Sequence, residues 1–258
     1  MKLDVVNYHT TEANLEYFSV SQFKSFLECE AKAMAELSGE YEREDSKALM
    51  MGSYVDAYFS NELDEFVQRN TSIFNSRTGD LKAEYKDCNK YIARAERDPI
   101  FMDYMDGDKQ TIMTGELFDQ PFKVKLDVFN GERIVDLKLI KDFDKVWTGT
   151  ESVSFVDAWG YDFQGFAYQA IVEQNTGKKL PFYLAVITKE KHPQIRVIEL
   201  PQWYLDSAGE VMSYYIERFA SVKAGEIEPK RCELCDYCKD TYYIGHVMSY
   251  EDLLEMEV

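Results

Sequence analysis

Two acidic residues and a lysine stand close together within the segment Pro121–Lys141. Asp127 is followed by Asp136 on the next alternating run, and Lys138 comes two residues later. Carboxylate oxygens are the ligands that hard divalent cations prefer. The residue types therefore indicate a site for a divalent cation, provided that the fold brings the three side chains together.

The element that must position these side chains is a β-hairpin with Asn130 and Gly131 at its turn. Asn-Gly between two alternating runs is the strongest short-range signal for a two-residue type I′ turn, because both central residues take positive φ there. Phe129 and Glu132 are then the pair that closes the turn. This choice fixes the register of the two strands, and with it the face on which each side chain lies.

The expected register places the polar side chains on one face of the hairpin. Asp127 and Asp136 are diagonal neighbours there, with Cβ atoms roughly 7 Å apart, so that one divalent ion could bridge them. Lys125 and Lys138 share this face. The other face carries the apolar residues Val124, Leu126, Val128, Val135, Leu137 and Leu139. The alternative is an ordinary solvated sheet face, where Asp and Lys are common and short motifs arise by chance.

Composition narrows the class of protein. The chain has 258 residues, of which 45% are hydrophobic, so it can bury a substantial core. A net charge of -18 argues against non-specific nucleic-acid binding by the whole surface, but it leaves room for a local positive track. The N-terminus lacks a secretory apolar region and no apolar run could span a bilayer, so we expect a cytoplasmic protein. Five cysteines in such a chain argue against structural disulfides.

The remaining segments read as helices around an antiparallel sheet. Helices are predicted from Ser19 or Ser21 to Leu37, Ser46 to Glu62, Leu81 to Arg97, Ser152 or Ser154 to Gln174, and Tyr204 to Ala224. Besides the hairpin, strands are predicted at Gln110–Phe118, Leu180–Thr188 and Gln194–Leu200. The polar segment 64–80 reads as a loop. This order predicts an α+β fold with a mostly antiparallel central sheet flanked by helices.

Four further residues extend the pattern. Gly52 and Asp56 lie one turn apart on the second predicted helix, and Gln164 and Tyr168 lie one turn apart on the fourth. With the acidic pair and the lysine of the hairpin, they resemble the PD-(D/E)XK nuclease superfamily. Within it, the RecE-like phage exonucleases, which are related to RecB- and AddB-type nuclease domains, are the most similar branch.

The resemblance covers Ser19 to Cys238 and implies the restriction-endonuclease-like αβββαβ core. We therefore expect residues 1–258 to form one nuclease domain. It has an N-terminal helical part at 19–97 and a cysteine-containing C-terminal tail at 229–258.

The resemblance also implies a role for each residue of the hairpin. Asp127 and Asp136 hold catalytic Mg²⁺ or Mn²⁺ with the help of the Leu137 carbonyl. Lys138 positions or deprotonates the attacking water and offsets the charge on the phosphate. The chemistry explains these residue types, because hard cations prefer carboxylate oxygens and hydrolysis of a phosphodiester needs an activated water with positive charge near the phosphate.

Residues outside the hairpin complete the implied site. Gln164 and Tyr168 match the helix motif that orients the nucleophile or the DNA backbone, and Glu116 on the preceding strand could contribute through a water. The helical histidine of the family is Asp56 here, and His9, His192 and His246 are too far along the chain to replace it locally. An aspartate ligates a hard cation well, so Asp56 is a candidate ligand, with a lysine pair as its alternative role.

The C-terminal part carries a compact group of cysteines. Cys232, Cys235 and Cys238 place three thiols within seven residues, and Cys29 from the first predicted helix could supply a fourth. AddB-type and CRISPR-associated relatives hold a [4Fe-4S] cluster with one N-terminal and three C-terminal cysteines. Three thiolates plus one also suit zinc, and free cytosolic thiols are the third alternative. Cys88 reads as a small core residue.

The resemblance implies a Mg²⁺-dependent, ATP-independent exonuclease that digests one strand of duplex DNA from its end, 5′ to 3′. Its product would be 3′ single strands for a RecT-like annealing partner in phage-type recombination within a bacterial host cell. Relatives of this kind form rings around DNA, so a homo-oligomer is expected.

Two other functions stay open. One is an Fe-S single-strand DNA exonuclease of the CRISPR-associated or AddB type. The other is a non-catalytic subunit that binds DNA ends. The presence of Asp127, Asp136 and Lys138 argues against this alternative.

Overall fold

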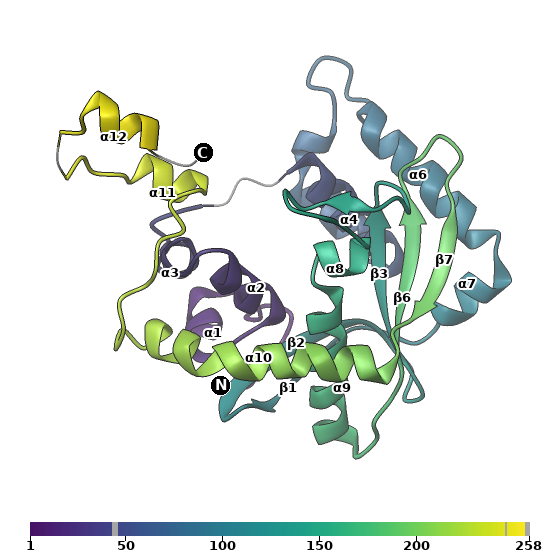
Figure 1. Cartoon of the computed structure of the whole chain (residues 1–258). Helices are drawn as coiled ribbons and strands as arrows, with labels where there is room; N and C mark the ends of the chain where they lie inside the picture. Colours follow the sequence, from purple (N-terminus) through teal and green to yellow (C-terminus); the bar gives the residue numbers. More distant parts are fainter. Residues whose placement is uncertain (43–45, 246, 256–258) are drawn as a thin grey trace.

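The structure is a computed structural model that describes residues 1–42, 46–245 and 247–255. A five-stranded sheet in the order β1-β2-β3-β6-β7 forms its centre, and helices lie on both sides (Figure 1). The strands are β1 (Asp108–Leu117), β2 (Gln120–Phe129), β3 (Ile134–Ile140), β4 (Val146–Trp147), β5 (Ser152–Val153), β6 (Phe182–Thr188) and β7 (Ile195–Glu199). Strands β4 and β5 form a separate pair.

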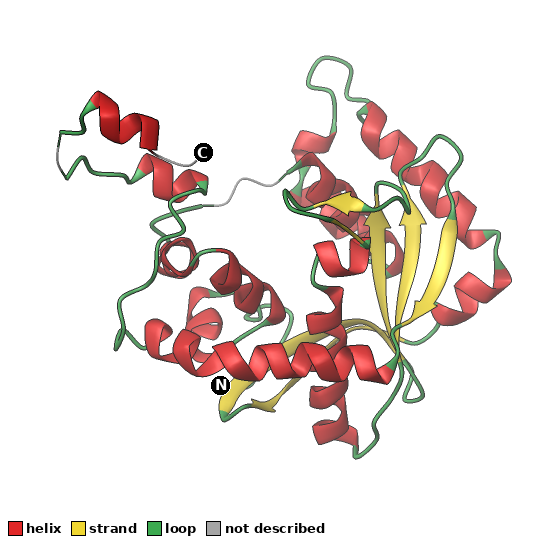
Figure 2. Cartoon of the chain, viewed as in Figure 1, coloured by secondary structure: helices red, strands yellow, loops and turns green. Residues whose placement is uncertain are grey.

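Seven α-helices precede the sheet in the described part of the chain: α1 (Thr11–Glu16), α2 (Val20–Glu28), α3 (Glu30–Ser38), α4 (Lys47–Phe59), α5 (Leu63–Arg69), α6 (Ala83–Glu96) and α7 (Pro99–Tyr104). Five follow β3: α8 (Phe155–Ala158), α9 (Tyr161–Thr176), α10 (Gln202–Lys223), α11 (Asp236–Asp240) and α12 (Tyr250–Glu255). Figure 2 shows α11 and α12 at one end of the molecule, away from the sheet.

The pairing of the strands explains where the helices lie. Strand β3 pairs with β6 in parallel, and every other neighbouring pair of the central sheet is antiparallel. A parallel pair needs a long crossover connection, and α8 and α9 lie on that connection. The predicted α+β class, with a mostly antiparallel sheet between helices, is confirmed.

Each face of the sheet is covered by its own apolar core. One core lies under α2, α9 and α10 and includes Phe23, Phe26, Leu126, Ile171, Leu184 and Phe219. The other lies under α4, α6 and α7 and includes Val55, Cys88, Ile92, Phe101, Val128, Val135, Leu137 and Ile187. The prediction that the hairpin has a single apolar face is therefore wrong, because the apolar residues of the hairpin are divided between the two cores. The expectation that Cys88 is a core residue is confirmed.

The hairpin closes in a different register from the expected one. Phe129 pairs with Ile134, and Glu132, its expected partner, lies inside a longer turn at 130–133. The Asn130 side-chain oxygen accepts hydrogen bonds from two backbone N–H groups of this turn, each at 3.1 Å. Asn130 lacks the positive φ that a type I′ turn requires. The prediction of a two-residue turn was wrong, because an asparagine whose side chain stabilises a wider turn gives the same sequence signal.

Two of the predicted long helices are interrupted. Cys29 has an extended backbone, ends α2, and caps α3 by accepting a hydrogen bond from the Lys32 N–H. Gly160 takes a left-handed conformation, with φ 58°, between α8 and α9. Apolar spacing runs through both interruptions, which is why periodicity alone merged each pair of helices.

The segment 64–80 is more ordered than the loop prediction. It contains most of α5 and a short 3₁₀ helix, Thr71–Ile73. Phe66 packs edge-on against Tyr54 of α4, and Ile73 is fully buried. The partner of Phe66 lies on α4, outside the segment, so the polar composition of the segment did not indicate this contact.

Two other expectations concern the C-terminal tail and membrane-spanning segments. The tail predicted at 229–258 contains α11 and α12, whereas His246 and residues 256–258 lie outside the described residues. In the described part of the chain, no helix combines the length and the apolar character needed to cross a lipid bilayer.

Close helix packing at Gly165 gives a test of this fold. A Cβ there would stand 2.7 Å from a methyl carbon of Leu205 and 2.8 Å from the ring of Phe182, both of which are buried. Overpacking of this kind costs about 1–3 kcal/mol, more than the ~1 kcal/mol of helix propensity that alanine gains. Gly165→Ala should therefore lower the free energy of unfolding, as measured by urea denaturation.

The matched control is Gly52→Ala on α4, where a Cβ would meet no atom within 4 Å. This substitution should raise the free energy of unfolding by about 0.5–1 kcal/mol, because only the propensity changes. A stabilising effect at both positions would contradict the packing of α9 between β6 and α10.

Candidate active site

A cleft of about 930 Å³ opens between α4, the end of β3 with the loop that follows it, and the start of α9. Asp56, Asp127 and Lys138 lie among its lining residues. The exposed rings of Trp147 and Trp159 also line it, with 64% and 56% of their surface exposed. The cleft thus combines acidic, basic and aromatic groups, which is a suitable composition for a nucleic-acid substrate.

Asp127 sits where two strands separate. The ladder between β2 and β3 ends at Val128 and Val135, and the carboxylate of Asp127 then accepts a hydrogen bond of 2.9 Å from the Leu137 N–H. The carboxylate therefore takes the place of a backbone partner. Burial raises the pKa of Asp127 well above its usual range, and the carboxylates of Asp136 and Asp56 raise it further.

Asp136 is the buried acidic group of the site, with 1% of its surface exposed. Its Oδ2 forms an ion pair of 2.6 Å with the Lys138 ammonium, and its Oδ1 accepts a hydrogen bond of 2.6 Å from the Gln164 amide. Burial lowers the pKa of Lys138, but Asp136 and Asp127 outweigh this effect and raise it above its usual range. The lysine therefore stays charged. The solvated-face interpretation of the hairpin is wrong at Asp136.

Helix α9 brings three side chains over this ion pair. Gln164 also lies 2.9 Å from the hydroxyl of Tyr168, one turn further along the helix. The Lys138 ammonium lies 4.9 Å from the ring centre of Tyr161. Burial raises the pKa of Tyr168 well above its usual range, followed by the charges of Asp136 and Asp127, so its hydroxyl stays protonated. The helix thus fixes both the carboxylate and the ammonium.

Asp56 on α4 is held by an amide and not by a lysine. The Gln110 amide donates to both carboxylate oxygens at 3.2 Å and to the Ser60 hydroxyl at 3.0 Å. Burial raises the pKa of Asp56 to about 6, and Lys125 and Lys138 act against this rise. The amide fixes the carboxylate at the cleft without neutralising its charge.

Two residues of the site had no signal in the sequence. Gln110 lies on β1 in the left-handed region, with φ 50°, and is buried. This conformation is rare for a residue with a side chain and is typical of functional sites. Lys24 on α2 donates to the Trp159 carbonyl at 2.9 Å, and burial, followed by the charge of Lys138, lowers its pKa to about 8. Only tertiary contacts reveal either residue.

Glu116 is not brought to this group. It is exposed near the end of β1, where its backbone N–H donates to Gln174 of α9. It lies six positions along the strand from Gln110, which is roughly 20 Å in an extended chain. The structure brings together the other predicted side chains, namely Asp56, Asp127, Asp136, Lys138, Gln164 and Tyr168.

The acidic group fits a hard divalent cation in its chemistry. Asp56, Asp127 and Asp136 supply carboxylate oxygens, and the charge of Asp136 raises the pKa of both other carboxyl groups. Lys138 is the ammonium that pairs directly with this group in the described part of the chain. A divalent cation would relieve the remaining repulsion between the carboxylates.

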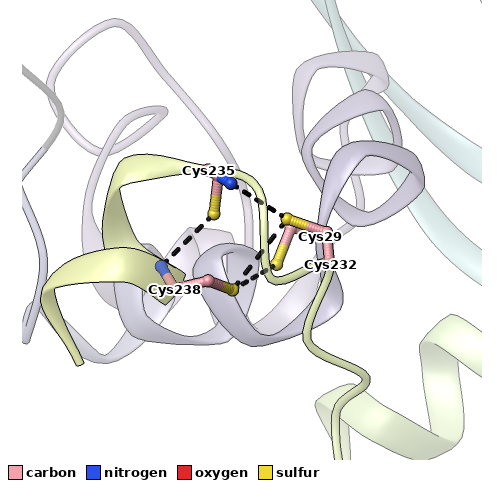
Figure 3. Close-up of side chains that lie close together, drawn as sticks. All are labelled: Cys29, Cys232, Cys235 and Cys238. Carbon is pink, nitrogen blue, oxygen red and sulfur yellow. Dashed lines mark hydrogen bonds between the residues drawn. The ribbon is translucent and has the colours of Figure 1, made fainter. Parts of the chain in front are cut away.

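The four predicted cysteines also lie close together, and none of them lines the cleft. The sulfur atoms of Cys29, Cys232, Cys235 and Cys238 all lie within 4.8 Å of one another (Figure 3). No other group of three or more histidine, cysteine or acidic residues is this tight among the described residues. All four thiols are free of disulfide bonds.

Comparisons with known proteins agree with this geometry. A family described as "PDDEXK-like domain of unknown function (DUF3799)" matches residues 19–241. A crystal structure described as that of a "Putative exonuclease" from Eubacterium rectale is 45% identical in sequence and superposes with a TM-score of 0.94. The match covers 99% of this chain and 99% of that one. Among curated proteins there is no match.

The charges of the site predict opposite effects of two substitutions on stability. Asp127→Asn keeps an oxygen for the Leu137 N–H and removes a repelled charge, so the free energy of unfolding should rise by about 1 kcal/mol. Lys138→Met leaves the buried Asp136 carboxylate without its ammonium partner. The free energy of unfolding of this variant should therefore fall by about 3 kcal/mol. Urea denaturation at neutral pH without divalent cations measures both.

The control for both substitutions is Lys86→Met, on the exposed side of α6. It should change the free energy of unfolding by less than about 0.5 kcal/mol. Equal losses for Asp127→Asn and Lys138→Met would show that the carboxylates do not repel one another in the folded state.

Proposed function

Since the chain belongs to the DUF3799 family of PDDEXK-like domains and is therefore a nuclease, we propose that it is a Mg²⁺-dependent exonuclease acting on duplex DNA ends. The observation that carries the proposal is the buried pair of Asp136 and Lys138, held by Gln164 beside Asp127 at the cleft. The description of the similar Eubacterium rectale protein as an exonuclease supports the same activity.

The residues at the cleft have complementary roles in hydrolysis. Asp56, Asp127 and Asp136, with the Leu137 carbonyl, would hold Mg²⁺ or Mn²⁺, which activates water and neutralises phosphate charge when bound. Lys138 stays protonated because of its carboxylate neighbours, so it donates hydrogen bonds to the attacking water or the phosphate. Gln164 holds the Asp136 carboxylate in place.

The lining of the cleft supports DNA as the substrate. Lysines and aspartates are equal in number there, and two of the aspartates, Asp56 and Asp127, are candidate metal ligands. A bound divalent cation therefore makes the cleft net positive, although the whole chain carries a charge of -18. Trp147 and Trp159 offer exposed rings on which the bases of a separated strand can stack.

The remaining features of the proposed function rest on the resemblance to RecE-like enzymes. They are ATP-independent digestion in the 5′ to 3′ direction, delivery of 3′ single strands to a RecT-like annealing partner, and a ring-shaped homo-oligomer. Recombination of the phage type in a bacterial host cell is the biological role that combines them.

Cleavage of end-labelled linear duplex DNA with Mg²⁺ tests the proposed activity. The chain should release nucleotides from the ends and leave closed circles intact. Asp136→Asn and Lys138→Ala should lower the rate by about 100-fold or more, because each removes charge stabilisation of the transition state. Lys86→Ala and Glu210→Gln, on the exposed sides of α6 and α10, are the matched controls and should keep the rate.

Three outcomes would contradict this function. Equal cleavage by Asp136→Asn and the unmodified chain would indicate a contaminating nuclease and favour the non-catalytic subunit. Digestion of circles would indicate an endonuclease. A strong preference for single-stranded over duplex substrates would favour a single-strand exonuclease.

Binding of the metal can be measured without DNA. A ligand at 100 times its dissociation constant stabilises the folded state by about 2.7 kcal/mol, so Mn²⁺ or Mg²⁺ should raise the melting temperature. Asp127→Asn should abolish this rise, and Asp56→Asn should reduce it, since each removes a proposed ligand. Glu210→Gln should retain it. An undiminished rise in Asp127→Asn would place the ion elsewhere.

A further inference from the structure

We propose that Cys29, Cys232, Cys235 and Cys238 bind a single zinc ion that fastens the C-terminal segment to α3, and that they do not hold a four-iron cluster. This site is separate from the cleft, and it stands or falls independently of the proposed nuclease function. Zinc and thiolates form such a site without redox chemistry, because each thiol releases its proton to solvent as the ion binds.

The distances between the sulfur atoms carry the choice of metal. Cys238 lies 3.6 Å from Cys29 and 3.9 Å from Cys232, and all four sulfurs fall within 4.8 Å of one another. Four thiolates around one zinc ion, with bonds of about 2.3 Å in tetrahedral geometry, stand roughly 3.8 Å apart. The sulfurs are therefore spaced for one shared ion.

The same spacing disfavours an iron–sulfur cluster. A [4Fe-4S] cluster is held by four cysteine thiolates, each on a different iron atom. Two such thiolates are separated by a metal–metal edge as well as by two metal–sulfur bonds, so they must stand farther apart than ligands of one ion. Sulfurs 3.6 Å and 3.9 Å apart leave no room for that body.

Backbone donors around the sulfurs suit thiolates. Cys232 accepts from the N–H groups of Leu234 and Cys235 at 3.5 and 3.3 Å, within a C-x₂-C turn in which Glu233 takes the left-handed conformation. Cys235 accepts from the Cys238 N–H at 3.5 Å. Hydrogen bonds from such donors stabilise the negative charge that metal binding creates on sulfur.

The fourth ligand comes from the interruption between α2 and α3. Cys29 accepts from the Lys32 N–H at 3.5 Å as the cap of α3, and its sulfur lies beside the C-terminal thiols (Figure 3). An uninterrupted helix would have offered no cap residue there. The break in the helix thus has a structural consequence, because it presents Cys29 to a segment about 200 residues away.

Polar contacts beside the sulfurs set the two chain segments in place. Glu30 forms two hydrogen bonds of 2.7 Å with Arg218 of α10 and accepts from the Lys230 N–H at 2.7 Å. The Lys230 carbonyl in turn accepts from Ala31 at 3.0 Å. The scaffold that brings the thiols together is therefore built from three separate parts of the chain, and the ion would lock it.

Metal analysis of the full chain, purified without added metal or chelator, tests the proposal. We expect about one zinc ion per chain and a colourless protein. Iron with inorganic sulfide and a brown colour would overturn the proposal in favour of a cluster. A metal-free chain, or a mass two hydrogens lower from a disulfide between these thiols, would overturn it as well.

Cysteine variants locate the ion. Cys235→Ser should lower the zinc content to below about one tenth of an ion per chain, since three thiolates bind weakly. Cys88→Ala is the matched control, because Cys88 is the remaining cysteine and is buried against α4 in the other core. It should retain the ion. Retention of zinc by folded Cys235→Ser would contradict the proposed ligands.

Cobalt replacement keeps the test valid if Cys235→Ser fails to fold. Co²⁺ exchanged into the unmodified chain should give the intense visible absorption of a tetrahedral thiolate site, which octahedral carboxylate sites lack. Removal of the ion with a chelator should lower the melting temperature and open 225–245 to protease. An octahedral spectrum, or an unchanged melting temperature, would overturn the proposal.

Discussion

The burial of the Asp136 carboxylate is the constraint on which the site depends. A charge with 1% of its surface exposed is tolerable only when it is paired and hydrogen-bonded. Lys138 supplies the charge from the same side of the same strand, and Gln164 supplies the donor from α9. The second contact requires the start of α9 to lie beside Asp136, and α9 belongs to the crossover connection that the parallel pairing of β3 with β6 needs. The fold and the site therefore follow from one arrangement.

The separation of β2 from β3 makes the cleft. After Val128 and Val135 the two strands no longer pair, and the Asp127 carboxylate takes the Leu137 N–H that a neighbouring strand would otherwise bind. An unpaired buried N–H would cost about 1–3 kcal/mol, so the acidic side chain contributes to stability at the point where the sheet opens. Its negative charge is at the same time repelled by Asp136 and Asp56. Asp127 thus satisfies a backbone N–H group and at the same time raises the electrostatic energy of the site.

The sequence predicted most of the residues that meet at the site, with Glu116 as an exception, but not how the chain brings them together. Alternation and helical spacing placed Asp127, Asp136 and Lys138 on strands and Gln164 on a helix, and the structure groups them. The register was wrong because Asn130 caps a wider turn, and local signals do not distinguish the two turns. The break at Cys29 was missed because apolar spacing continues through it.

Other parts of the site depend wholly on contacts between distant segments. Gln110 was read as an ordinary strand residue, yet its left-handed backbone turns the amide toward Asp56. Lys24 reaches the site because α2 packs beside the Trp159 carbonyl. Neither spacing nor composition encodes such contacts. Gln110 and Asp56 lie 54 positions apart, and Lys24 and Trp159 lie 135 positions apart, so folding of the whole domain is needed to complete this group of charged side chains.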